Sequence, residues 1–232
     1  MNTPIVWVVL PAAGSGSRMQ SATKKQFLEI HNESILAHTL RAFNQHPQIH
    51  GIVIVTGLED IPEVRAIAAA FDKVKKITAG GATRQESVYA GLQQVPDVCD
   101  IVLIHDAARP MISSSLISDC IGLTSECGCA IAATPVKDTI KRTDSLGIVL
   151  DTPERSSLWN VQTPQAFRYS EILAAHQKAS SLADTTCTDD GAVMERYGTT
   201  PVRLIMGSYQ NIKITTPEDL ILAEYYLRGD QL

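Results

Sequence analysis

The sequence contains no long hydrophobic run. The apolar stretch IVWVVLP at 5–11 is far shorter than the roughly 18 residues that a membrane-spanning helix requires. The four residues before it, MNTP, carry no basic side chain, unlike the start of a secretory signal. We therefore expect no membrane partner and a cytoplasmic protein.

Cysteine pairs at metal-binding spacing are also missing, and so is an excess of basic residues. The five cysteines include no C-x-x-C pair, and CGC at 127–129 has no second ligand pair, so reduced and mostly buried thiols are favoured over a zinc site. The formal net charge of −5 argues against a general nucleic-acid-binding protein. An anionic ligand must therefore meet a local group of basic residues.

The common glycine-rich nucleotide motifs are incomplete. GSGSRM at 14–19 matches the first two glycines of G-x-G-x-x-G, but Met19 replaces the third, and no G-K-[ST] completes a P-loop. No acidic residue ends the apolar run GIVIVTG at 51–57, which argues against an NAD-dependent oxidoreductase.

What the sequence does contain is an alternation of apolar runs and amphipathic segments. Val- and Ile-rich runs predict strands at 5–11, 51–57, 74–79, 100–106 and 129–136. Apolar residues at helical spacing predict helices at 34–46, 59–71, 83–95 and 114–126. Strands this continuously apolar are covered on both faces. We therefore expect an α/β fold with a doubly wound, mostly parallel, Rossmann-like sheet that binds ligands beyond the carboxyl ends of its strands.

This alternation is interrupted after Val136. Residues 137–162 hold two short β-like runs around the turn sequence DSLG and no helix-length segment, so we expect a β-hairpin arm that projects from the sheet. Helices at 170–182 and 189–198, strands at 202–207 and 211–215, and a last helix with Thr216 as N-cap and Pro217 at its first position should follow. Residues 1–232 are expected to form one domain with this arm.

Basic residues follow the glycine turn of the first strand. Backbone N–H groups near Gly14 can approach an anion closely, and Arg18, Lys24 and Lys25 add positive charge. The alternative is a tight turn with solvated bases.

Two further strand ends carry residues suited to a nucleotide. Gly80 and Gly81 follow the third strand, with Ser87 in the next helix. Asp106 ends the fourth strand, where this fold places a metal ion or a ribose. Alternatively, Asp106 caps the turn that follows it.

Together these segments resemble a known enzyme family. The chain carries, in this order, LPAAGSGSRM, KKQF, GGATRQESV, HDAARP, PVKDTIKR, WNVQTPQAF, TDD and NIKITTPEDL, a pattern similar to that of the methylerythritol-phosphate cytidylyltransferases of the non-mevalonate isoprenoid pathway. The resemblance spans residues 10–220. Lys24 stands where this family often has proline, and Ala82 where an acidic residue is common.

The resemblance implies a nucleotidyltransferase that joins 2-C-methyl-D-erythritol 4-phosphate to the α-phosphorus of CTP and releases pyrophosphate. The attacking phosphate is already mostly ionised at neutral pH, because its second pKa is about 6. No general base is therefore needed, and positioning and charge neutralisation should dominate catalysis. The alternatives are a ribitol- or ribulose-5-phosphate cytidylyltransferase and a non-catalytic nucleotide-binding module, which would be expected to lack Arg18 or Lys25.

The resemblance also implies roles for individual residues. Catalytic residues are expected at Arg18, Lys25, Arg155 and Lys213. The residues expected around the nucleotide are Pro11, Ala12, Ala13, Gly14, Gly80, Gly81, Ala82, Ser87 and Asp106. The polyol phosphate is expected to contact Asp106, Arg109, Thr139, Arg155, Thr188 and Lys213, and Mg²⁺ to be bound near Asp106.

Without the resemblance, several of these residues have simpler explanations. Lys213 would be a solvated lysine at a strand end, Thr139 and Arg155 a cross-strand polar pair, and Thr188 the cap of the following helix.

The arm itself indicates an interface. It carries Ile140, Ile148, Val149, Leu150 and Trp159, which a single domain would struggle to bury. The resemblance implies a homodimer with exchanged arms, in which the arm positions enter the neighbouring site.

Overall fold

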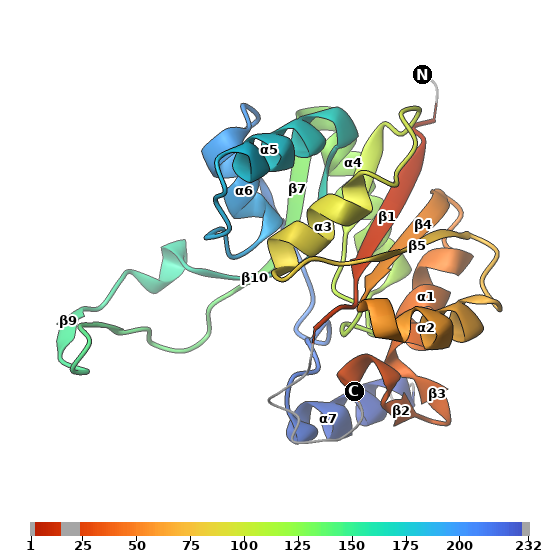
Figure 1. Cartoon of the computed structure of the whole chain (residues 1–232). Coiled ribbons are helices and arrows are strands. Elements are labelled where there is room, and N and C mark those ends of the chain that lie inside the picture. The colour runs from red at the N-terminus through yellow and green to blue at the C-terminus, as the bar shows by residue number, and fades with distance from the viewer. Residues whose placement is uncertain (1–2, 15–23, 229–232) are drawn as a thin grey trace.

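The structure is a computed structural model that describes residues 3–14 and 24–228. Arg18 and Met19 lie outside the described residues. A seven-stranded sheet forms the centre of the molecule, in the order β11-β7-β10-β6-β1-β4-β5 (Figure 1). Its strands are β1 (Val6–Pro11), β4 (Ile49–Thr56), β5 (Val74–Ala79), β6 (Ile101–Ile104), β7 (Cys129–Pro135), β10 (Trp159–Arg168) and β11 (Leu204–Met206).

The sheet is mostly parallel, as predicted, and β10 is the exception. β1 runs parallel to β4 and β6, β4 to β5, and β7 to β11. β10 lies between β6 and β7 and is antiparallel to both. The sequence pattern assigned the start of this strand to the arm, whereas Trp159 pairs with Pro135 of β7 in the main sheet.

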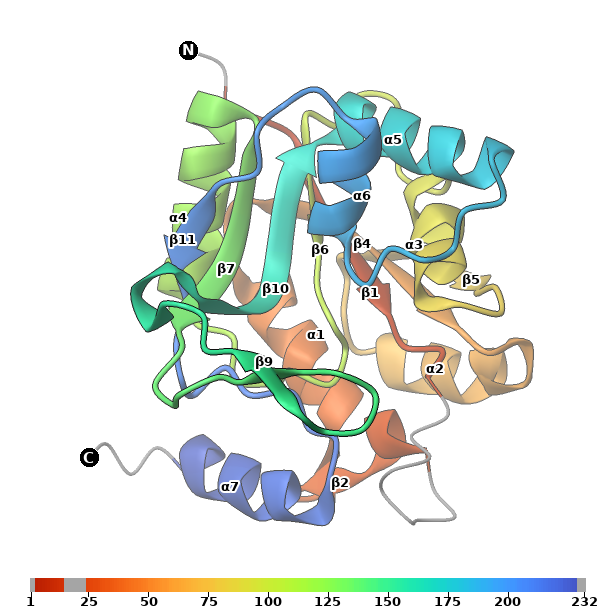
Figure 2. The same cartoon turned by 90° about the vertical axis from the view of Figure 1, so that its left-hand side faces the viewer.

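Two layers of helices cover the sheet (Figures 1 and 2). On one face, α1 (Ile35–Gln45), α2 (Ile61–Ala68) and α4 (Ser114–Cys127) pack over one core cluster. On the other face, α3 (Arg84–Leu92), α5 (Tyr169–Ser181) and α6 (Asp190–Tyr197) pack over a second cluster. Consecutive residues of β1 face opposite layers, since Val8 belongs to the first cluster and Val9 to the second. This arrangement confirms the doubly wound α/β fold.

A small third cluster joins the end of the chain to the body. In it, α7 (Pro217–Leu227) packs beside β2 (Glu29–Ile30), which pairs with β3 (Glu33–Ser34) (Figure 2). The predicted start of α7 is confirmed: Thr216 is its N-cap and Pro217 opens it. In the part of the chain that the structure describes, no helix combines the length and apolar character needed to cross a membrane.

The segment at 211–215 is not the predicted strand. Isolated hydrogen bonds hold it in place instead. The Asn211 side-chain amide donates to the Thr163 carbonyl at 2.8 Å, and the Ile214 N–H donates to the Ala108 carbonyl at 2.9 Å. Within this segment the Asn211 and Ile214 side chains are buried, three positions apart, which is not the two-residue period of a strand.

The connection between β7 and β10 leaves the body as an arm (Figure 1). Within it, β8 (Arg142–Thr143) pairs with β9 (Val149–Asp151), and a short 3₁₀ turn, η4 (Arg155–Ser157), precedes β10. Apolar arm residues are exposed, among them Leu146 (84%) and Leu150 (61%). Because β10 starts at Trp159, the projecting part is shorter at its carboxyl end than the range 137–162.

Candidate active site

A cleft of about 420 Å³ lies beyond the carboxyl ends of β1, β5 and β6. The sequence-predicted residues that line it are Pro11, Ala12, Ala13, Gly14, Lys25, Gly81, Ala82, Ser87, Asp106 and Lys213. Sequence reasoning missed Gln26, Thr83, Arg84, Ala107 and Ala108, which also line it. The cleft therefore combines residues from five separate segments at the edge where this fold binds ligands.

The turn after β5 is tied to the start of α3. The Ser87 hydroxyl accepts a hydrogen bond from the Gly81 N–H at 3.2 Å and donates to the Thr83 carbonyl at 2.9 Å. A Cβ at Gly80 would lie 2.5 Å from the Ser87 hydroxyl oxygen, so glycine permits this close approach. Gly80 itself is not among the residues that line the cleft. Thr83 and Glu86 form a reciprocal capping box at the helix start. The turn and the helix terminus are thereby fixed beside the cleft.

Asp106 is surrounded by basic side chains. Its carboxylate lies 2.8 Å from Lys213 Nζ, 3.4 Å from Arg84 Nε and 3.7 Å from Arg109 Nε. Burial by itself raises the pKa of Asp106, but the three cations, Arg84 foremost, hold that pKa well below its usual range. Asp106 is thus an ionised carboxylate inside a positive site, which is a more specific role than capping a turn.

Arg84 links Asp106 to a second buried carboxylate. Its Nη2 lies 2.8 Å from Asp190 Oδ2, and His176 Nε2 lies 3.2 Å from the other oxygen of Asp190. The Asp190 and His176 side chains are 1% and 0% exposed. Burial lowers the pKa of Arg84, but Asp190 and Asp106 more than offset this and raise it. Arg84 is therefore a permanently charged bridge between the cleft and the α5–α6 layer.

Thr163, in the TPQ segment of β10, contacts both Asp106 and His105. The Asp106 N–H donates to the Thr163 hydroxyl at 3.1 Å, and that hydroxyl lies 3.1 Å from His105 Nδ1. His105 Nε2 lies 3.1 Å from the Arg109 carbonyl. Burial lowers the pKa of His105 to about 4, so this histidine is neutral and structural.

The two adjacent lysines take different directions. They begin the turn η2 (Lys25–Phe27), where Lys25 lines the cleft. The ammonium of Lys24 instead lies 2.7 Å from carboxylate oxygens of both Glu59 and Asp60. The lysine that resembles the family's catalytic residue is therefore the one at the cleft.

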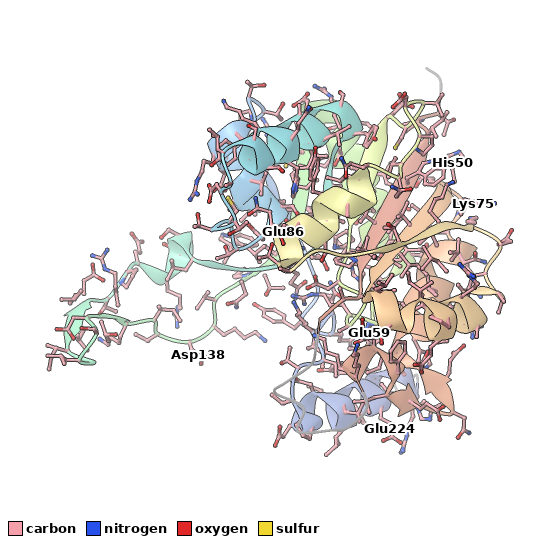
Figure 3. The ribbon with its side chains drawn as sticks, in the orientation of Figure 1. His50, Glu59, Lys75, Glu86, Asp138 and Glu224 are labelled. Carbon is pink, nitrogen blue, oxygen red and sulfur yellow. The ribbon has the colours of Figure 1, made fainter. Side chains whose placement is uncertain are left out.

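Among the predicted residues that the structure describes, Arg109, Thr139, Arg155 and Thr188 are not part of the cleft lining of their own chain. Arg109 Nε lies 3.7 Å from the Asp106 carboxylate, and Arg109 Nη1 donates to the Asn211 carbonyl at 2.7 Å. Thr139 and Arg155 are exposed on the arm, and Figure 3 shows Asp138, the neighbour of Thr139, on the projecting part. Arg155 Nη1 donates to the Lys137 carbonyl at 3.1 Å.

Two of the simpler explanations are wrong. Thr188 is exposed, but the helix α6 is capped by Asp189, whose side chain accepts from the Ala192 N–H at 2.8 Å. Lys213 is paired with Asp106 rather than solvated at a strand end.

Comparison with known proteins identifies the family. The model of the 2-C-methyl-D-erythritol 4-phosphate cytidylyltransferase family matches residues 6–229. The chain belongs to this family. It is 48% identical over 223 residues to the Clostridium botulinum (strain ATCC 19397 / Type A) cytidylyltransferase, covering 95% of this chain and 96% of that one. It is 46% identical over 223 residues to that of Desulforamulus reducens, covering 95% and 94%.

Solved structures agree with this family assignment. The 4-diphosphocytidyl-2C-methyl-D-erythritol synthase of Anaerococcus prevotii has a TM-score of 0.86 and 32% sequence identity, over 97% of both chains. A Thermus thermophilus cytidylyltransferase has a TM-score of 0.79 and 29% identity, over 97% of this chain and 99% of that one. The activity predicted from the resemblance is confirmed: this cytidylyltransferase transfers a cytidylyl group from CTP to 2-C-methyl-D-erythritol 4-phosphate in the non-mevalonate pathway.

Proposed function

We propose that the cleft places the triphosphate of CTP against Lys25 and Arg18, with the cytidine held between Pro11–Gly14 and the turn at Gly81. A phosphate oxygen of 2-C-methyl-D-erythritol 4-phosphate attacks the α-phosphorus. The bond from that phosphorus to the oxygen bridging to the β-phosphate breaks, and pyrophosphate leaves with the electron pair. The observation that carries this assignment is that Lys25 lines the cleft together with Gly14 and Ser87.

The chemical problem is one of charge, because one phosphate anion attacks another while a third leaves. Cations fixed in advance around the reacting atoms lower the barrier without reorganising during the reaction. Lys25 and Arg18 neutralise charge that builds at the α-phosphoryl group and the leaving oxygen. Lys213 and Arg109, held in place by Asp106, attract the phosphate and polyol of the second substrate.

Mg²⁺ is proposed to lie near Asp106. Among residues 3–14 and 24–228, no three His, Cys, Asp or Glu side chains are grouped to hold a metal ion. Asp106 is an ionised carboxylate lining the cleft, and one carboxylate plus substrate phosphates is a common way for proteins to bind this ion. The residues present therefore fit a nucleotide-bound Mg²⁺, which would neutralise phosphate charge.

The arm is proposed to serve a partner subunit. In a homodimer with exchanged arms, Thr139 and Arg155 of one subunit would bind the polyol phosphate in the other, and Thr188 would complete that pocket. This is supported by the exposure of the apolar arm residues, such as Ile148 and Val149, in the single chain. Five free cysteines support a reducing, cytoplasmic location.

The assignment of Lys25 is tested by comparing two neighbouring substitutions. Lys25→Ala should lower kcat by about 100- to 1000-fold, the loss expected when one charge-stabilising contact is removed from a transition state. Lys24→Met should cost much less, because its ammonium faces Glu59 and Asp60. Steady-state rates of pyrophosphate release measure both, and equal losses would show that the assignment is wrong.

A further inference from the structure

The two acidic residues after β4 hold the segment that carries Lys25. Lys24 Nζ lies 2.7 Å and 2.8 Å from the two oxygens of Asp60 and 2.7 Å from Glu59 Oε1. The Asp60 side chain is 9% exposed and that of Glu59 is 71% exposed. The bond to Asp60 is therefore the sheltered one, and the bond to Glu59 is open to water and screened by it.

This ion pair connects the cleft lysine to the central sheet. The Lys24 carbonyl accepts the Phe27 N–H at 2.9 Å and so closes the turn η2. Within η2, Gln26 is 2% exposed and lines the cleft, and Phe27 packs against the first core cluster. The carboxyl end of the turn is thus fixed by packing, and its amino end by Lys24.

The acidic partner is itself rigidly placed. Asp60 ends the turn η3 (Leu58–Asp60), where its N–H donates to the Gly57 carbonyl at 3.0 Å. That turn follows β4 directly, and β4 pairs along its length with β1, which ends at Pro11 in the cleft. The sheet edge that forms the nucleotide turn therefore also sets the position of Asp60.

We propose that Lys24 is a positioning residue, whose ion pair with Asp60 orients Lys25 toward the reacting phosphates. The inference rests on the proposed role of Lys25. Misplacing a catalytic group by about 1 Å costs up to about 100-fold in rate. Breaking the pair should therefore lower kcat by about tenfold, which is less than the loss of Lys25 itself.

The experiment compares single and paired variants. Lys24→Met should lower kcat about tenfold, and Lys24→Arg, which still reaches both carboxylates, should restore most of it. In a Lys25→Ala background, Lys24→Met should have no further effect on kcat, since contacts that act as a unit are not additive. An equal tenfold loss in that background would overturn the proposal, because Lys24 would then act independently of Lys25.

Loss of stability is separated from loss of positioning by a second variant. Lys24→Met leaves the Asp60 carboxylate unpaired, whereas Lys24→Met with Asp60→Asn removes both charges and should recover the thermal midpoint while kcat stays low. Recovery of kcat together with stability would also overturn the proposal. The matched control is Lys75→Met at the amino end of β5, away from Glu59 (Figure 3), which should keep wild-type kcat.

The proposed function and this inference fail in different ways. A fully active Lys25→Ala enzyme would reject the role of Lys25 and the inference with it. An impaired Lys25→Ala enzyme beside a wild-type Lys24→Met enzyme would reject only the positioning role.

Discussion

Asp106 is a carboxylate that stays charged inside the candidate cleft because basic residues surround it. An unpaired buried carboxylate would bind a proton, whereas Lys213, Arg84 and Arg109 keep this one ionised. The same contacts hold the three cations in one place before any substrate arrives. Asp106 therefore organises positive charge, in addition to the metal-binding role proposed for it.

Replacing Asp106 with Asn should change the response of the enzyme to Mg²⁺. The amide is a weaker ligand than the carboxylate, so the Mg²⁺ concentration for half-maximal rate should rise by about tenfold or more. A Mg²⁺ titration of the initial rate at saturating CTP measures this shift. The control is Asp97→Asn, at an exposed position. An unchanged Mg²⁺ dependence of Asp106→Asn would exclude Asp106 as the metal ligand.

The arm is an element whose proposed role can be separated from nucleotide binding. Arg155→Ala on the arm and Lys213→Ala beside Asp106 should each raise KM for the polyol phosphate by about tenfold or more, since a charged contact to a phosphate is lost. The affinity for CTP, measured by calorimetry, should stay near the wild-type value.

Arg142→Ala provides the matched control for this test. Arg142 lies on the same arm and pairs with Asp151, so its loss should leave both substrate constants unchanged. Weakened CTP binding in both the Arg155 and the Lys213 variants would contradict the division of the site between the two substrates.

The strands that were predicted correctly are those whose apolar residues pack in the core. The strands β1, β4 and β6 are buried on both faces, so their apolar sequences were sufficient to predict them as strands. β10 was not predicted as a strand, because it buries the polar side chains of Gln162, Thr163 and Gln165. These side chains hydrogen-bond to residues in and around the cleft. Because they are polar, a prediction based on hydrophobicity does not identify the strand.

In the candidate site, local sequence signals likewise predict some residues, whereas contacts between distant residues are not predicted. Arg84 had a local signal, because the Thr83–Glu86 capping box places it at a helix start beside a glycine turn. Its partner Asp190 lies 106 positions further along the chain, and no local pattern predicts that contact. Contacts of this kind depend on how the layers pack over the sheet, so only the folded chain reveals them.

At the scale of the whole molecule, arm exchange predicts complementation between two impaired chains. An Arg155→Ala chain is co-purified with a Lys25→Ala chain and assayed at a polyol-phosphate concentration below the wild-type KM. If arms are exchanged, one site of the heterodimer has both residues intact, and up to about half of the wild-type activity returns. If each arm serves its own chain, both sites carry a lesion, and a heterodimer shown to have formed will be no more active than the Arg155→Ala homodimer.

The stability of the whole fold should fall in mild acid, in part because of His105. Its pKa is 6.5 when unperturbed and about 4 in the native protein, so below pH 6.5 the unfolded chain takes up a proton that the native state does not. The free energy of unfolding should therefore decrease as the pH falls from about 6.5 to 4, by at most about 1.4 kcal/mol per pH unit from this residue. Urea unfolding at several pH values measures the slope. His105→Asn should show a shallower slope, and an identical slope would contradict this role.

The position of β10 also has a consequence for the order in which the chain folds during synthesis. β1, β4, β5 and β6 pair with one another, so this half of the sheet can form once residue 104 has left the ribosome. Among the described strands, β7 pairs only with β10 and β11, both of which are synthesised after it. We therefore expect a nascent chain that ends within the arm to hold β7 outside the sheet with its backbone unpaired, which is the kind of exposed edge that chaperones protect from aggregation. The arm is made just before β10, the strand that joins the two halves of the sheet, so each chain exposes the arm proposed to bind a partner subunit before those halves are joined.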